Sequence, residues 1–391
     1  MKYSLATDSW DDKEFEAIER VIKSKNFTMG EEVKQTENKF AEYFGSKYCV
    51  MSNSGSSANL LAIASLIYSG RLNKGDEVIV PAVSWSTTYN PLQQYGLKVV
   101  FVDVDLATLN YDLEALKNSI TKSTKMIFIV NLLGNNNDFD KINIMAEINN
   151  LIIIEDNCES MGSKYNDKYS GTFGLIGTFS SFFSHHISSM EGGYCLTDDY
   201  ELYNYMKSIR AHGWTREVDT NGLDNIATQS DFYKYFDFVL PGYNLRPLEI
   251  EAAIASVQLD KLKSIVKTRR SNALYFLKKA KNNPLFFVQE ELGESSWFGF
   301  SIVLKDKYKE FRDELAEYLI SNNIDCRPIV TGNFTRHHVI NYFDYKIHGI
   351  LTNADYIHDY GLFIGNNGKI IYKQIDYFYK TIENFLEKID E

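Results

Sequence analysis

One stretch decides the fold class: Tyr48-Cys-Val-Met51-Ser-Asn53-Ser-Gly55-Ser-Ser57, which continues into Ala58–Tyr68. A short apolar run is followed by small polar residues and then by a segment with helical periodicity, which predicts a strand, a tight loop and a helix. Further apolar runs alternate with polar helical segments through the first 200 residues: Glu77–Val80, Val99–Val102, Met126–Val130 and Leu151–Glu155. This alternation predicts an α/β fold with a largely parallel sheet.

The pattern changes near residue 250, where we place the boundary between two domains. Residues 1–250 are expected to form a large domain, and residues 251–391 a smaller C-terminal α+β domain. The elements expected in this region are a long helix at Glu249–Lys281 interrupted near Lys263, a strand within Trp297–Leu304, a helix at Tyr308–Asn322 and a polar tail. A flexible loop is expected at Gly222–Gln229.

Composition limits the classes of function. The chain has 391 residues, of which 44% are hydrophobic and 24% charged, as in ordinary globular proteins. Its formal charge of −11 argues against nucleic acid or an anionic membrane as a partner. The apolar runs are too short to span a bilayer, no cleavable signal is visible, and the four cysteines are widely scattered. We therefore expect a cytoplasmic enzyme without a metal site.

Two predicted strands end in residues suited to binding small molecules. After the first strand, Gly55 and Ser56 stand where a backbone can approach an anion at a helix start, although an ordinary serine N-cap explains them as well. After Leu151–Ile154 come the acids Glu155, Asp156 and Glu159. Ligands of open α/β sheets bind at the carboxyl ends of the strands, so this group is a candidate site. The alternative is a solvated strand end.

The segment Thr178-Phe-Ser180-Ser-Phe-Phe-Ser-His185-His186-Ile-Ser-Ser-Met-Glu191-Gly192-Gly193 contains the second candidate site. An imidazole can transfer protons near neutral pH, which makes either histidine a possible base. If this segment is a strand, neighbouring side chains point to opposite faces and only one histidine can face a ligand. Two further candidate residues are Trp85, in the segment Pro81–Thr88, and Asn244, in the segment Pro241-Gly-Tyr-Asn-Leu-Arg246. The alternative interpretation of each, taken alone, is a tryptophan of the core and a polar turn before a helix.

Together these elements resemble, in their order, the DegT/DnrJ/EryC1/StrS sugar aminotransferases, which have the aspartate-aminotransferase-like fold (fold type I) and use pyridoxal phosphate (PLP). The resemblance runs from Trp10-Asp-Asp12 to Cys326-Arg-Pro-Ile-Val-Thr-Gly-Asn333. Members of the family carry a lysine six residues before Glu-Gly-Gly that binds PLP covalently. In this chain, His185 occupies that position and cannot form such a link.

The resemblance implies a role for each candidate residue. Asp156 would keep the pyridine nitrogen protonated, Trp85 would stack on the ring, Ser180 would bind the phosphate, and His185 would be the base. Further cofactor contacts are implied at Gly55, Ser56 and Glu159, and substrate contacts at His212 and Arg246. Asn244 would reach the cofactor phosphate of a neighbouring subunit, which implies a homodimer with shared active sites.

The missing lysine also implies a reaction. The chain resembles the branch of the family that holds pyridoxamine phosphate (PMP) without a covalent link and removes the C3 hydroxyl of a nucleotide-linked 4-keto-6-deoxy sugar, of the GDP-mannose type. The resemblance also implies that L-glutamate regenerates PMP, and the scattered cysteines favour this route over a cysteine-ligated iron–sulfur centre as the electron source. The alternatives are a nucleotide-sugar aminotransferase with an altered site and a non-catalytic relative that binds a nucleotide sugar.

Overall fold

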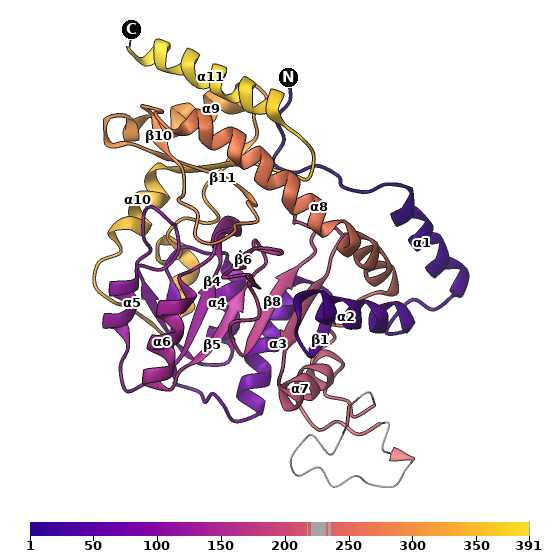
Figure 1. Ribbon diagram of the computed structural model, residues 1–391. Coiled ribbons are helices and arrows are strands. Elements are labelled where there is room, and N and C mark those ends of the chain that lie inside the picture. The colour runs from indigo at the N-terminus through magenta and orange to yellow at the C-terminus, as the bar shows by residue number, and fades with distance from the viewer. Residues whose placement is uncertain (217, 220–231, 234–235, 391) are drawn as a thin grey trace.

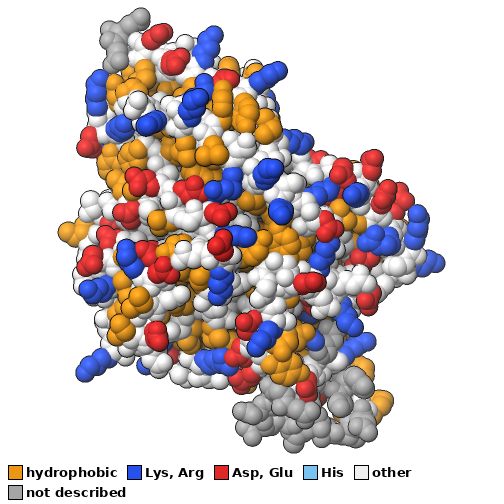
Figure 2. Space-filling view, viewed as in Figure 1, with side chains coloured by type: hydrophobic (Ala, Val, Ile, Leu, Met, Phe, Trp, Pro, Cys, Tyr) orange, Lys and Arg blue, Asp and Glu red, His pale blue; other side chains and the backbone are white. Residues whose placement is uncertain are grey.

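The structure, a computed structural model, describes residues 1–216, 218–219, 232–233 and 236–390 (Figure 1). The loop expected at Gly222–Gln229 lies outside these residues. Within them, no helix is long and apolar enough to cross a membrane. Acidic and basic side chains are interspersed on the face shown in Figure 2, so the negative net charge is not gathered into one area there.

An eight-stranded sheet forms the centre of the larger lobe. All neighbouring strands are parallel except β1–β9 and β9–β8, which confirms the expected largely parallel α/β sheet. The spatial order is β1 (Tyr48–Ser52), β9 (Gly193–Thr197), β8 (Ile176–Ser180), β5 (Ile152–Asp156), β4 (Thr124–Val130), β2 (Glu77–Pro81), β3 (Lys98–Val102) and β13 (Tyr345–Ile347).

Side chains alternate between the two faces of this sheet, and each face is covered by helices. Val78 and Val80 belong to a core with α3 (Gly55–Tyr68), whereas Ile79 belongs to a core with α6 (Phe139–Asn149). Because both faces are buried, the central positions of these strands, such as Val78–Val80 and Val99–Val102, are apolar in succession and do not alternate with polar residues. The other helices of this lobe are α1 (Asp12–Ser24), α2 (Glu31–Phe44), α4 (Ser86–Gln94), α5 (Leu113–Ser119) and α7 (Tyr200–Arg210), and a small ribbon is formed by β6 (Lys164–Tyr165) and β7 (Lys168–Tyr169).

The C-terminal lobe is built on a four-stranded antiparallel sheet. Figure 1 shows α8 (Glu249–Ala280) running from the neighbourhood of α1 and α2 to this lobe, where it meets the C-terminal helix. The strand order is β10 (Phe286–Phe287), β11 (Gly299–Leu304), β14 (Gly361–Gly365) and β12 (Cys326–Arg327), and the helices are α8, α9 (Arg312–Ser321), α10 (Thr352–Tyr360) and α11 (Tyr372–Asp390).

The helix expected at Tyr308–Asn322 is present as α9, with a 3-10 turn, Asp306–Phe311, directly before it. Two other expectations for this lobe were wrong. α8 is not interrupted near Lys263, since its buried positions, among them Leu259, Leu262 and Ile265, continue with helical spacing through that point. The polar tail instead contains β14 and α11, whose apolar residues enter the core of the lobe. The boundary near residue 250 stays a prediction, and β13 returns from the C-terminal region to the large sheet.

Candidate active site

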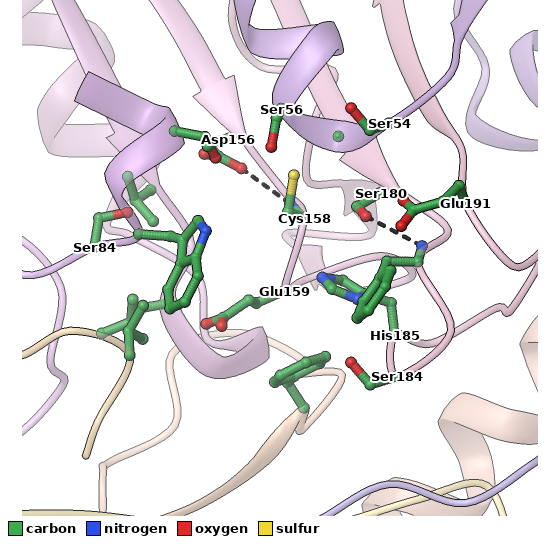
Figure 3. Close-up of a pocket in the computed structure, with 18 of the residues that line it drawn as sticks. Ser54, Ser56, Ser84, Asp156, Cys158, Glu159, Ser180, Ser184, His185 and Glu191 are labelled. Atoms are coloured by element: carbon green, nitrogen blue, oxygen red, sulfur yellow. Dashed lines mark hydrogen bonds between the residues drawn. The ribbon is translucent and has the colours of Figure 1, made fainter. Parts of the chain in front are cut away.

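A cavity of about 320 Å³ lies at the carboxyl ends of β5 and β8. Its walls contain seven of the residues singled out from the sequence: Gly55, Ser56, Trp85, Asp156, Glu159, Ser180 and His185. Figure 3 shows Glu159 and His185 pointing into the space that these residues enclose. Segments far apart in the sequence therefore meet at the sheet edge where open α/β folds bind ligands.

The start of α3 forms one wall of the cavity. Ser54 is the N-cap, and its Oγ accepts a hydrogen bond from the Ser57 N–H at 3.1 Å. A side chain at Gly55 would not fit, because its Cβ would lie 2.6 Å from Cβ of Ser180 and 2.9 Å from Sγ of Cys158. The first N–H groups of a helix have no partner inside the helix and attract anions. The N-cap and the anion-binding interpretations therefore describe the same turn.

Asp156 is held rigidly at the end of β5. Its Oδ2 accepts hydrogen bonds from Asn59 Nδ2 and Thr88 Oγ1, both at 2.8 Å, and its Oδ1 accepts one from the Cys158 N–H at 3.1 Å. Asn59 is in turn fixed by Thr178, whose hydroxyl donates to Asn59 Oδ1 at 2.6 Å. These contacts keep the carboxylate aimed at the cavity. Two of the donors come from α3 and α4, which no sequence pattern connects with Asp156.

Glu155 has a different environment although it is the adjacent residue. Its carboxylate accepts hydrogen bonds from the backbone N–H groups of Gly171, Phe173 and Gly174 at 2.6 to 2.7 Å. Burial raises the pKa of Glu155, and these three donors oppose the shift. Glu155 thus stabilises a loop and does not line the cavity, whereas Asp156 does.

Trp85 and Glu159 complete the wall near Asp156. Trp85 lies just before α4 and is 51% exposed, so one indole face is available to a flat ligand. Glu159 accepts a hydrogen bond from the Leu133 N–H at 3.1 Å. Burial raises the pKa of Glu159, and the positive charge of Arg327 counteracts this effect. A carboxyl group in this position can accept or donate a hydrogen bond to a polar ring substituent.

The segment that carries the two histidines is not a strand. β8 ends at Ser180, and residues 181–190 form turns and bends. The premise that alternating strand positions separate the two side chains was therefore wrong, but the loop separates them nonetheless. His185 lines the cavity, whereas His186 is 1% exposed and its Nε2 lies 3.2 Å from the Ser296 carbonyl oxygen.

His185 is electrically neutral in this environment. Burial, helped by the positive charges of Arg327 and Arg269, lowers the pKa of His185 to about 3. Its Nδ1 is buried and has no hydrogen-bond partner among the described residues. Its ring lies 5.2 Å from that of Phe298, measured between centroids. A neutral imidazole with an unused nitrogen at a cavity wall is able to accept a proton from a bound ligand.

The loop of residues 181–190, which we call the histidine loop, is held in place by contacts outside the cavity. Trp10 Nε1 donates to the Ser188 carbonyl at 2.9 Å, and the Ser188 N–H donates to Gln258 Oε1 at 3.2 Å. The hydroxyls of Ser181 and Ser189 are 2.6 Å apart and close the base of the loop. The N-terminal segment and α8 thus fix a loop that lacks regular secondary structure.

Three predicted site residues do not line this cavity: His212, Asn244 and Arg246. They lie close together, because Ala211 pairs with Asn244 in an isolated bridge and the Asn244 Oδ1 accepts a hydrogen bond from Arg246 Nε at 3.0 Å. The side chain of Asn244 is exposed. Within one chain, these residues therefore form a separate surface group.

The structure also adds residues that the sequence reasoning missed. Asn59 and Thr88 hold Asp156, and Phe298, Arg327 and Val330 bring the C-terminal lobe into the cavity wall. The only signal for Arg327 was its place in the segment Cys326–Asn333, to which no role was given. Contacts made across hundreds of residues have no local pattern that could reveal them.

The lining fits a phosphorylated aromatic cofactor. The turn at Gly55 leaves room for an anion, Trp85 offers a flat face, and Asp156 is a fixed, buried carboxylate able to hold a ring N–H. No lysine is among the described residues that line the cavity, so nothing in this wall can link such a cofactor covalently.

Comparisons with known proteins agree with this geometry. The sequence pattern of the DegT/DnrJ/EryC1/StrS aminotransferase family matches residues 8–382. The chain is 54% identical to GDP-4-keto-6-deoxy-D-mannose 3-dehydratase of Escherichia coli O55:H7, over 98% of this chain and 100% of the relative. Two crystal structures of GDP-4-keto-6-deoxymannose-3-dehydratase, a mutant with bound GDP-perosamine and one with a trapped PLP-glutamate geminal diamine, each match with a TM-score of 0.95. Both are 54% identical over 97% of this chain and 100% of theirs.

Proposed function

The chain belongs to the DegT/DnrJ/EryC1/StrS aminotransferase family, and we propose that it is a PMP-dependent sugar 3-dehydratase and not an aminotransferase. Its proposed substrate is GDP-4-keto-6-deoxy-D-mannose, from which it removes the C3 hydroxyl to give GDP-4-keto-3,6-dideoxy-D-mannose. The nucleotide and sugar are taken from the relatives, which are 54% identical to this chain over nearly its whole length.

The observation that carries this proposal is the position of His185. It lines the cavity and corresponds, by its place in the sequence, to the cofactor lysine of the family, and the described lining contains no lysine to replace it. A lysine amine can displace a sugar amine from the cofactor and so release an amino sugar, whereas an imidazole only transfers protons. Histidine in place of lysine at position 185 is therefore expected to change the product of the reaction as well as its rate.

His185 is the proposed base. When bound, PMP supplies a primary amine for the C4 ketone and a pyridine ring that accepts electrons. His185 would take the proton from the carbon next to that amine, and the bound cofactor would supply the electrons that release the C3 hydroxyl of the sugar. Anionic ligands beside His185 raise the pKa of the imidazole from the value set by burial, which brings it nearer to a useful basicity.

The other cavity residues bind and orient the cofactor. Asp156 is proposed to hold the pyridine N–H, and its anchoring by Asn59 and Thr88 fixes where the ring lies. Trp85 covers one face of the ring. The remaining proposed contacts are to the phosphate, from Gly55, Ser56 and Ser180, and to a polar ring substituent, from Glu159.

L-Glutamate is the proposed amine donor that restores PMP after each dehydration. A relative has been captured with a PLP–glutamate adduct. The amino group passes to the cofactor and glutamate leaves as 2-oxoglutarate, so no external reductant is needed. The cysteines offer no cluster for an iron–sulfur alternative, because all four are free and far apart in the sequence: Cys49, Cys158, Cys195 and Cys326.

We also propose a homodimer in which Asn244 of one chain reaches the cofactor phosphate of the other. Its support is that Asn244 is exposed and lies outside the cavity of its own chain, together with His212 and Arg246, the proposed sugar-binding residues. A two-fold dimer would bring this group to the neighbouring site and repeat the arrangement. The cytoplasmic location stays a prediction.

The proposed function is tested by incubating the protein with GDP-4-keto-6-deoxymannose, PLP and L-glutamate. The mass of the sugar product is then measured by mass spectrometry. The proposal requires a product lighter than the substrate by one oxygen atom. A product in which nitrogen replaces the C4 oxygen would establish an aminotransferase. Unchanged substrate that nevertheless binds tightly would establish a non-catalytic nucleotide-sugar-binding relative.

A further inference from the structure

A segment of the C-terminal lobe, residues 290–298, lies against the large lobe beside the cavity, and we call it the strap. It lies between β10 and β11. The N–H groups of Ser296 and Phe298 donate to backbone carbonyls of the loop after β4, at 2.9 and 3.0 Å. In that loop Gly134 has a φ of 88°, and a Cβ at this position would lie 2.6 Å from the backbone nitrogen of Trp297. The strap is therefore packed directly on the large lobe, with no room for a side chain between them.

Buried side chains hold both ends of the strap. At its start, Asn135 of the large lobe donates from Nδ2 to the Glu290 carbonyl at 2.8 Å and accepts at Oδ1 from the Leu292 N–H at 2.9 Å. At its end, Arg269 of α8 donates to the Phe298 carbonyl at 2.9 Å. Both Asn135 and Arg269 are buried. Because hydrogen bonds between groups shielded from water are costly to break, the strap is a fixed point beside the cavity.

The strap also holds one residue of the histidine loop. His186 is buried, and its Nε2 lies 3.2 Å from the Ser296 carbonyl oxygen. Because a carbonyl oxygen only accepts hydrogen bonds, Nε2 of His186 carries the proton and donates it. Phe298 of the strap lies against both histidine rings, at centroid distances of 5.2 Å from His185 and 5.7 Å from His186. The neighbour of the proposed base is thus bonded to a fixed segment, and the base packs on the same segment.

The ring of His185 lacks a hydrogen bond that would orient it. Figure 3 shows this ring directed into the cavity. A catalytic histidine is commonly oriented by the partner of its second ring nitrogen, but Nδ1 of His185 is buried without a hydrogen-bond partner among the described residues. The nearby Phe182 carbonyl opposes the fall in the pKa of His185 without forming a hydrogen bond to Nδ1. Packing and the backbone therefore orient the ring, and His186 anchors the backbone directly beside it.

We propose that His186 is a positioning residue, whose hydrogen bond to the Ser296 carbonyl keeps His185 directed into the cavity. The C-terminal lobe thereby determines where the base stands. This inference rests on the proposed function, in which His185 is the base. Without the bond, the loop beside the base can shift, and a misplacement of about 1 Å can lower a rate by about 100-fold. Cofactor binding should change little, because its proposed contacts come from the sheet edge and the start of α3.

A single turnover of the sugar by PMP-loaded protein tests this inference. His186→Phe keeps a ring but cannot donate, and the rate should fall by about 10- to 100-fold while the affinity for the sugar is kept. Deuterium at the methylene carbon of PMP should slow this variant more than the wild type, because proton transfer then limits the rate. His186→Gln, whose amide nitrogen stands close to the place of Nε2, should recover most of the lost rate.

The matched control is His337→Phe. His337 lies outside the cavity, and its Nε2 is 2.8 Å from the Thr331 carbonyl oxygen, so the same kind of hydrogen bond is removed elsewhere. This variant should keep the wild-type rate. If His186→Phe does not fold, His186→Asn gives the same comparison, because its shorter amide does not reach the Ser296 carbonyl.

A second measurement uses position 185 as a reporter and does not depend on the sugar reaction. In a His185→Lys background, the absorbance of the covalent adduct between PLP and the new lysine measures whether residue 185 faces the cofactor. Adding His186→Phe should reduce the fraction of adduct, whereas adding His186→Gln or His337→Phe should leave it unchanged.

Two results would overturn the inference. One is an equal rate and an equal deuterium effect in His186→Phe and the wild type, which would make His186 a packing residue. The other is the same loss of rate in His186→Phe and His186→Gln, because the hydrogen bond would then not be the cause. Failure of the wild type to dehydrate the sugar, with adduct formation still dependent on His186, would count against the proposed function alone.

Discussion

The edge of the large sheet and the C-terminal lobe contribute to one cavity in different ways. At the sheet edge, Gly55, Asp156 and Ser180 each follow or end a short strand, and their spacing along the chain already indicates a site. From the C-terminal lobe, Phe298 and Arg327 enter the same wall without any local motif. The sheet edge thus carries the residues proposed to bind the cofactor, whereas the C-terminal lobe closes the same cavity beside the proposed base, His185.

The largest effect expected at the sheet edge is that of His185→Asn. Removing a general base should lower sugar dehydration by about 10²- to 10⁴-fold, because the amide cannot accept the proton. Product formation by PMP-loaded protein measures this loss, and His338→Asn, an exposed histidine outside the cavity, serves as the control. If His186→Asn lost the activity and His185→Asn kept it, with both proteins folded, the assignment of the base would be reversed.

The next largest effect is expected for Asp156, and it should differ from the effect of changing the adjacent acid of β5, Glu155. Asp156→Asn should lower turnover by about 10²- to 10³-fold, as losses of a fixed charge in an active site commonly do. Glu155→Gln should instead lower the free energy of unfolding by about 1–3 kcal/mol and leave turnover intact, because Glu155 accepts three backbone N–H groups away from the cavity. Thermal unfolding and turnover, measured on both variants, separate the two roles. The same activity loss in both would show that the sheet edge acts as a unit.

The same contrast explains how much the sequence could predict. The strands and the α3 turn follow from apolar runs and small residues, which are local features. His185 was singled out because its spacing to Glu191 resembles that of the family's cofactor lysine, and the structure places it in the cavity wall. The uninterrupted α8 and the folded C-terminal segment were missed, because their apolar residues reveal a core only when the lobe packs together. Asn59 and Thr88 were missed for a similar reason: their hydrogen bonds to Asp156 join residues far apart in the chain.

A third prediction asks whether a second chain completes the cavity. If Asn244 serves the neighbouring site, mixing inactive His185→Asn protein with an inactive Asn244→Ala variant should restore activity, because one site of each mixed dimer carries neither change. Up to half of the wild-type activity per mixed dimer is expected. Turnover after mixing, with mixed dimers verified by mass, measures the recovery. No recovery in verified mixed dimers would place all these residues in one chain's site.

The smallest effect concerns the acid stability of the histidine loop. Burial lowers the pKa of His185 to about 3 in the folded protein, against about 6.5 in an unfolded chain, so the unfolded state binds more protons between these values. His185 therefore favours folding fully above about pH 6.5, and this advantage is lost as the pH falls toward 3. The free energy of unfolding of His185→Asn should consequently fall less steeply than that of the wild type across this range. Parallel curves for the two proteins would contradict the burial of this imidazole.

The most direct test of the central claim, that His185 replaces a covalent cofactor lysine, is borohydride reduction of the PLP-loaded protein followed by intact-mass measurement and peptide mapping. The wild type should show no pyridoxyl-lysine in the cavity, whereas His185→Lys should gain one pyridoxyl group, mapped to residue 185. A stoichiometric pyridoxyl-lysine in the wild-type protein would contradict the account.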